Sequence, residues 1–251
     1  MIRVENVCKT FGKKTVLKDI SVTLEAGKTN LIIGRSGSGK TVLLKSIVGL
    51  YGVDSGSIYY ADTDITKLDF NELKYLRQEV GMLFQGGALF DSQTVLENIM
   101  FPLNMFSNMT KKEKIKRVAF CLDRVNLSGV GKLYPAEISG GMNKRVAIAR
   151  AIALNPKYLL CDEPNSGLDP VTSILIDKLI SEITKEFNMT TVINTHDMNS
   201  VMEIGENVMF INEGEKCWEG SKDNIFTSDN EHLNHFVFAS ELLNKIRAIK
   251  K

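Results

Sequence analysis

The chain has 251 residues, and its 31 basic and 30 acidic side chains leave a net charge of +1. Proteins that bind nucleic acids usually carry a basic excess, so this balance argues against that class. Hydrophobic residues make up 43% of the chain, which is typical of a packed globule and argues against disorder.

Membrane-spanning and metal-stabilised proteins are also disfavoured. No apolar run approaches the roughly 20 residues that span a bilayer. Residues 1–5 alternate as a strand does, so we expect no secretion signal. The four cysteines are widely separated, and the three histidines form no cluster with them. We therefore expect reduced cysteines and no structural metal site.

The first 60 residues predict short strands joined by turns. Three segments are rich in β-branched and aromatic side chains: 3–8, 16–24 and 57–60. Residues 31–33 form an apolar strand that runs into a glycine-rich loop. A helix is expected after this loop, because Leu43, Leu44 and Ile47 share one helical face.

The middle of the chain, about residues 86–150, changes character. Strand-like runs disappear, and residues 111–125 combine many charges with apolar side chains at helical spacing. We interpret this part as a helical lobe inserted into the domain.

The α/β pattern returns after Pro156. Residues 158–161 predict a buried strand, residues 171–187 an amphipathic helix, and residues 191–194 another strand. A strand, a helix and a strand at this spacing predict a parallel sheet. A late hairpin is expected over two further segments: 207–212 and 216–220.

The C-terminal residues 228–251 predict an amphipathic helical tail, because Phe236, Ala239 and Leu243 recur at three- and four-residue intervals. Such a helix could dock on its own domain, or it could contact a second protomer or a regulatory protein. The sequence leaves both alternatives open.

A glycine-rich segment fits the phosphate-binding pattern G-x-x-x-x-G-K-[ST] in full, after a strand and at the start of a helix. Its glycines allow backbone N–H groups to turn toward phosphates, and the helix N-terminus favours negative charge. Lys40 is expected to reach the β- and γ-phosphates, and the Thr41 hydroxyl to bind Mg²⁺. The predicted ATP-binding residues of this segment are Gly34, Arg35, Ser36, Gly37, Ser38, Gly39, Lys40, Thr41 and Val42.

Polar residues that follow later strands predict the hydrolytic part of the site. A carboxylate at the end of a buried parallel strand faces the ligand crevice of the sheet, so Asp162 is expected to hold Mg²⁺. Glu163 is placed to polarise the attacking water as general base. His196 follows the next strand and could contact the γ-phosphate. Gln85 could bind Mg²⁺ or orient the water through its amide.

A second candidate anion site lies at residues 138–142, where Ser139 can cap the helix expected over residues 143–154. Gly140 and Gly141 expose N–H groups there. These groups could bind a phosphate, but the chain has only one phosphate-binding loop and so offers no second nucleotide to occupy this site.

Together these motifs resemble the ABC ATPase family. Residues 138–142 look like its L-S-G-G-Q signature, and residues 166–169 resemble its D-loop. The resemblance implies an α/β fold, namely a P-loop (RecA-like) core with an antiparallel β subdomain and the inserted helical subdomain, over residues 1–227. It implies Mg²⁺-dependent ATP hydrolysis, with Phe11 stacked on adenine. It also implies a head-to-tail dimer in which the signature of one copy caps the ATP of the other.

The signature carries Met142 where glutamine is usual, and it continues into Lys144. This resembles the ATPase subunits of Mla/Mce-type phospholipid transport systems. That resemblance implies an integral permease, an Mce-domain lipid-binding protein and sometimes a small STAS-like regulator. The chain would then lie at the cytoplasmic face of the inner membrane and power phospholipid transport between that membrane and the outer envelope.

Two alternatives remain. The chain could serve an ABC importer of a polar solute such as an amino acid, or act as a non-transport regulatory ATPase on cell-wall or division machinery. A DNA-repair or translation ATPase is disfavoured, because the chain contains neither an inserted coiled coil nor a second cassette.

Overall fold

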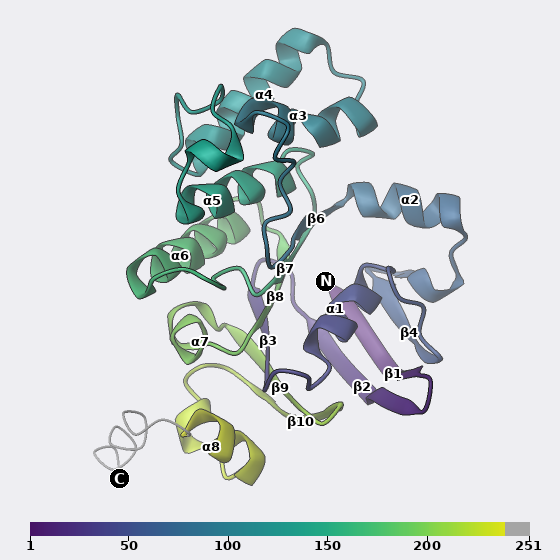
Figure 1. The fold of residues 1–251 in the computed structure, drawn as a ribbon. Coiled ribbons are helices and arrows are strands. Elements are labelled where there is room, and N and C mark those ends of the chain that lie inside the picture. The colour runs from purple at the N-terminus through teal and green to yellow at the C-terminus, as the bar shows by residue number, and fades with distance from the viewer. Residues whose placement is uncertain (239–251) are drawn as a thin grey trace. The chain divides into compact units, whose positions relative to one another are not determined.

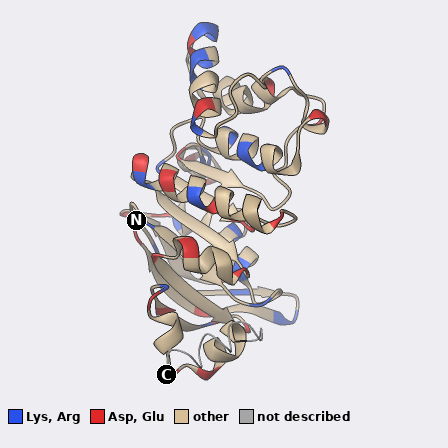
Figure 2. Ribbon diagram, turned by 90° about the vertical axis from the view of Figure 1, so that its left-hand side faces the viewer, with Lys and Arg blue, Asp and Glu red and all other residues tan. Residues whose placement is uncertain are grey.

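The computed structural model describes residues 1–238 and divides them between two compact units. Of the described residues, the first unit contains 1–25, 29–68 and 194–238, and the second contains 26–28 and 69–193. Acidic and basic side chains are mixed along the ribbon of both units, as the balanced composition predicts (Figure 2).

The first unit contains a four-stranded antiparallel sheet in the order β2-β1-β4-β5 (Figure 1). Its strands are β1 (Ile2–Phe11), β2 (Lys14–Leu24), β4 (Ser55–Tyr60) and β5 (Thr63–Asp64). Ile2 of β1 lies opposite Leu24 of β2 on one side and Tyr60 of β4 on the other. All three side chains are buried, so the alternation of the sequence gives this sheet its core face.

A second group of strands in the first unit carries the phosphate-binding loop. Strand β3 (Thr29–Ile33) pairs in parallel with β9 (Asn207–Asn212), which pairs antiparallel with β10 (Glu215–Gly220). Every residue of β3 is buried, which explains its continuous apolar run. The helices of the first unit are α1 (Lys40–Ile47), α7 (Met198–Ile204) and α8 (Glu231–Val237), and 3₁₀ turns lie at Ile65–Lys67 and Ile225–Thr227.

The second unit has a parallel pair of strands, β6 (Val80–Leu83) and β7 (Tyr158–Asp162). Helix α6 (Pro170–Glu186) leads from β7 into β8 (Thr190–Thr195), which lies beside β7. All residues of β7 and β8 are buried, so the polar residues that follow them mark the ends of core strands.

Helices fill the rest of the second unit: α2 (Phe70–Gln78), α3 (Val95–Phe106), α4 (Lys111–Arg124) and α5 (Gly140–Ala151), with a 3₁₀ turn at Pro135–Glu137. Helices α3, α4 and α5 pack against one another, and α5 also contacts α6 and β6. Between residues 86 and 150, all of which the structure describes, there is no strand. The exact bounds of a helical subdomain there stay a prediction.

Two details differ from the sequence expectation, and one prediction lies partly outside the described residues. Helix α5 begins at Gly140 instead of Asn143, because the Ser139 hydroxyl caps it by accepting a hydrogen bond from the Met142 N–H. Helix α2 was missed, although Asp69 and Glu72 form a capping box at its start. Of the tail predicted over residues 228–251, the part from 239 to 251 lies outside the described residues.

Candidate functional site

The phosphate-binding loop of the first unit depends on residues without a Cβ atom. Gly34 has φ +151° and Gly39 has φ +109°, conformations that other L-residues rarely adopt. A Cβ at Gly34 would collide with the backbone oxygen of Ile211, and one at Gly39 would lie 2.9 Å from that of Val16. The backbones of β2 and β9 thus contact the loop at positions where only glycine fits.

Two polar side chains within the loop fit an anion. Lys40 is only 5% exposed, and its Nζ donates hydrogen bonds to the carbonyl oxygens of Gly34 (2.8 Å) and Arg35 (2.9 Å). The Ser38 hydroxyl oxygen is buried and has no hydrogen-bond partner within the part of the chain that the structure describes. Since a buried hydroxyl without a partner is costly, the loop fits an added acceptor such as a phosphate oxygen.

The other loop residues vary in exposure. Arg35, Ser36 and Gly37 are exposed, whereas Thr41 and Val42 at the start of α1 are partly buried. The loop therefore combines three exposed residues, 35–37, with three buried residues, 38–40.

Phe11 and His196 also belong to the first unit. The Phe11 ring is 43% exposed at the end of β1, packs edge-on against Tyr51 at 5.4 Å, and lies 5.4 Å from Lys9 Nζ. An exposed and braced ring can stack on a flat aromatic ligand, which a core phenylalanine cannot do. His196 is exposed immediately after β8.

The predicted hydrolytic residues of the second unit lie where strands end. Asp162 is the last residue of β7 and is 6% exposed. Glu163 follows it with φ +47°, a left-handed conformation that is uncommon outside glycine and asparagine. Gln85 Nε2 donates to Glu163 Oε2 at 2.9 Å and lies 3.4 Å from Ser166 Oγ. An outlier of this kind supports the hypothesis of a functional carboxylate.

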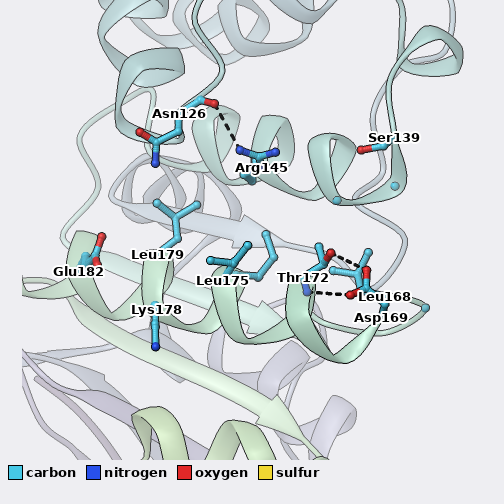
Figure 3. A pocket seen from close by; sticks show the side chains of 14 residues that line it. Asn126, Ser139, Arg145, Leu168, Asp169, Thr172, Leu175, Lys178, Leu179 and Glu182 are labelled. Carbon is cyan, nitrogen blue, oxygen red and sulfur yellow. Dashed lines mark hydrogen bonds between the residues drawn. The ribbon is translucent and has the colours of Figure 1, made fainter.

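The candidate signature lines a cavity of about 630 Å³ in the second unit (Figure 3). Ser139, Gly140 and Gly141 form one wall, and Gly167, Leu168 and Asp169 belong to its lining as well. A Cβ at Gly141 would lie 2.7 Å from Thr172 Cγ2. The glycine therefore allows the start of α5 to approach the start of α6, and the cavity brings the signature and the D-loop together.

Sequence reasoning missed two cations on α5 that donate hydrogen bonds to the segment of residues 84–88, here called the Gln85 loop. Lys144 Nζ donates to the Gln85 carbonyl oxygen. The two terminal nitrogens of Arg150 donate to the carbonyl oxygens of Ala88 (2.8 Å) and Gly87 (2.7 Å). No short sequence pattern marks these contacts, because α5 carries three cations that do not share one helical face.

Comparisons with known proteins agree with this geometry. The family model described as "ABC transporter" matches residues 17–166, more than half of the chain. The chain is 38% identical to the methionine import ATP-binding protein MetN of Campylobacter jejuni, over 97% of this chain and 77% of that protein. It is 37% identical to the probable ribonucleotide transport ATP-binding protein mkl of Mycobacterium tuberculosis, over 94% of this chain and 66% of that protein.

Solved structures agree as well. A dimeric post-hydrolysis structure of the ATP-binding cassette MJ0796, bound to ADP and Pi, superposes with a TM-score of 0.81 at 33% identity. The match covers 88% of this chain and 99% of that one. The predicted fold class, a P-loop α/β core with antiparallel and helical parts, is confirmed by this likeness. The chain belongs to the ABC transporter family, as one of its ATP-binding and ATP-hydrolysing members.

Proposed function

We propose that this chain is the ATPase subunit of a membrane transporter that imports a polar solute such as an amino acid. The observation that carries the proposal is the similarity to methionine import ATPases, which is 38–39% in identity and extends over 94–97% of the chain. An importer is one of the two alternatives that the sequence leaves open, and the relatives favour it over phospholipid transport.

The chemistry proposed is in-line attack of water on the γ-phosphate of ATP, which breaks the bond to the β–γ bridging oxygen and releases ADP and phosphate. The phosphate-binding loop holds the triphosphate, with Lys40 moving from its loop carbonyls onto phosphate oxygens. Glu163 accepts the proton of the attacking water, and Gln85 keeps the Glu163 carboxylate in place through its 2.9 Å hydrogen bond. His196 contacts the γ-phosphate, and Phe11 stacks on adenine.

Magnesium fits the available ligands, because Thr41, Gln85 and Asp162 offer the hydroxyl, amide and carboxylate oxygens that this ion prefers. When bound, Mg²⁺ neutralises charge on the phosphates.

A second copy of the chain is the first proposed partner. The cavity lined by Ser139, Gly140 and Gly141 offers exposed N–H groups at the start of α5, a favourable place for phosphate. In the proposed head-to-tail dimer, that phosphate belongs to the ATP held by the other copy. The dimeric state of the cassette MJ0796 supports this arrangement.

An integral permease is the second proposed partner. A cavity of about 370 Å³ beside the Gln85 loop is lined by partly exposed aromatic rings: Phe84, Phe90, Phe101 and Phe106. Val95 and Ile99 of the same region are fully buried, so helix α3 supplies both core and surface. Among the described residues, no helix is long and apolar enough to cross a membrane. We place the chain at the cytoplasmic face of the inner membrane through this permease.

Phospholipid transport remains a second candidate because of one residue. Met142 replaces the glutamine usual in the signature and is partly exposed at the start of α5. This is the feature that resembles Mla/Mce-type ATPases. An Mce-domain protein and a STAS-like regulator would be the partners in that case.

Affinity purification of the tagged chain from its native membranes, with mass spectrometry of co-purifying proteins and lipids, tests the proposal. We expect a multispanning permease together with a solute-binding protein. Recovery of an Mce-domain protein with phospholipid would replace the proposal by the second candidate. Recovery of a division or cell-wall partner, with ATP turnover but no solute uptake in vesicles, would point to a regulatory ATPase instead.

A further inference from the structure

Lys144 is a buried cation that no part of the proposed chemistry uses. It lies on α5, two residues after Met142, and is only 6% exposed. Burial lowers the pKa of its ammonium group, while the neighbouring Cys161 and Glu163 act in the opposite direction. A methionine of similar volume would avoid the cost of burying a charge, so the ammonium group calls for an explanation beyond packing.

The contact that Lys144 makes lies next to the hydrolytic residues. Its Nζ donates to the carbonyl oxygen of Gln85, and the side chain of the same Gln85 donates to Glu163 Oε2 at 2.9 Å. Gln85 thus accepts a hydrogen bond from α5 at its backbone carbonyl and donates one to the proposed general base through its side chain.

The Gln85 loop needs such support because its backbone is strained. Gly87 has φ +76° and Ala88 has φ +49°, two successive left-handed residues of which one carries a Cβ. Left-handed conformations of this kind persist only where surrounding contacts hold them. Arg150 donates hydrogen bonds to the carbonyl oxygens of Gly87 and Ala88 at 2.7 and 2.8 Å, and Lys144 donates one to that of Gln85. Two cations of α5 therefore fix three carbonyls of this loop.

We propose that Lys144 is a positioning residue for ATP hydrolysis, which holds the Gln85 backbone so that the Gln85 amide stays on Glu163. Because Lys144 belongs to the helix that opens with the signature, the contact also links the signature to the Gln85 loop. This inference rests on the proposed roles of Gln85 and Glu163.

The test compares three variants of the full chain. Lys144→Met removes the donor at similar volume, and Lys144→Arg retains a cation. Arg117→Met is the matched control, since Arg117 donates to the carbonyls of Ala153 (2.9 Å) and Ile152 (2.8 Å), neither of which belongs to the Gln85 loop. For each variant we would measure ATP turnover, ATP affinity, thermal unfolding, and hydrogen exchange of peptides that cover residues 84–88.

For Lys144→Met we expect about tenfold slower turnover, because a misplaced catalytic group loses rate without losing binding. ATP affinity should stay within about twofold, and exchange at residues 84–88 should accelerate. Lys144→Arg should recover most of the turnover, and Arg117→Met should change neither turnover nor this exchange. Should Lys144→Met fail to fold, Lys144→Gln, which keeps a donor on a shorter side chain, is measured in its place and should lie between wild type and the expectation for Met.

Two results would overturn the inference: unchanged turnover despite faster exchange, or slower turnover that merely parallels a loss of thermal stability with unchanged exchange. Glu163→Gln is assayed alongside to keep the two proposals apart. Normal turnover in Glu163→Gln would refute the base assignment, whereas the exchange and turnover of the Lys144 variants test the positioning role.

Discussion

The phosphate-binding loop of the first unit and the Gln85–Glu163 region of the second are built in different ways. The loop is one continuous segment, and its shape comes from glycines pressed against neighbouring backbone and from Lys40 bonded to loop carbonyls. The Gln85–Glu163 region joins residues from separate segments through hydrogen bonds between side chains and from side chains to backbone carbonyls. The difference teaches that nucleotide binding and nucleotide turnover should respond to different mutations.

Lys40→Ala is expected to cause the largest change. Loss of the buried ammonium should weaken ATP binding by about 100-fold, because charge-assisted hydrogen bonds to phosphate are among the strongest. Titration with a fluorescent ATP analogue measures the effect. Lys45→Ala, five residues further along α1, is the control and should bind normally. Equal weakening in both variants would mean that the helix, and not the loop lysine, was disturbed.

Gly141→Ala should act in the second unit without touching the loop. The added methyl group would lie 2.7 Å from Thr172 Cγ2, and the overlap should reduce the free energy of unfolding by about 1–3 kcal/mol. Urea denaturation measures this loss. The double variant with Thr172→Ser removes the opposing methyl group and should recover most of the stability. If the single variant is as stable as wild type, the close approach of α5 and α6 is not tight in solution.

Phe11→Ala should weaken ATP binding by about tenfold, which is the usual worth of one base stacked on an aromatic ring. ADP should weaken by the same factor, because the ring contacts the base and not the γ-phosphate. Phe11→Tyr should bind as wild type does. An effect on ATP alone would place Phe11 near the phosphates and break the assignment.

Asp64 provides the smallest expected effect, on stability in acid. Burial by itself would raise its pKa, but hydrogen bonds from Lys67, Thr66 and Ser57 outweigh this and lower the pKa to about 2. A lowered folded pKa stabilises the fold above the unfolded value of about 3.9, and this stabilisation is lost as the pH falls toward 2. Asp64→Asn should therefore melt earlier than wild type at pH 6, and the difference should vanish near pH 2. A difference that persists at pH 2 would contradict this account.

The two regions also differ in how far the sequence predicts them. The loop is predicted from eight consecutive residues because its geometry is local, and His196 is predicted from its place after a strand. The residues Gln85, Asp162 and Glu163 can be placed at strand ends in the same way. Phe11 is expected only from the family resemblance. The Gln85–Glu163 hydrogen bond, and the hold of Lys144 and Arg150 on the loop carbonyls, depend on how α5 packs against β6. Packing of this kind has no short sequence signal.

The fold shows the same limit. Strands with a clear apolar pattern, such as β3 and β7, are predictable within two residues. Helix α2 was missed although its sequence carries two signals. Phe70, Leu73 and Leu76 recur at three-residue intervals, and Asp69 and Glu72 form a capping box at its start, while none of its residues is buried in the structure.

The central claim is that the loop binds ATP while Glu163 turns it over, and Glu163→Gln tests it most directly. ATP affinity and single-turnover phosphate release would be measured on the same preparation. We predict affinity within about twofold of wild type and release slowed by at least about 100-fold, because the general base is lost while the loop is intact. Normal phosphate release, or a loss of affinity as large as that of Lys40→Ala, would contradict the separation of binding from turnover.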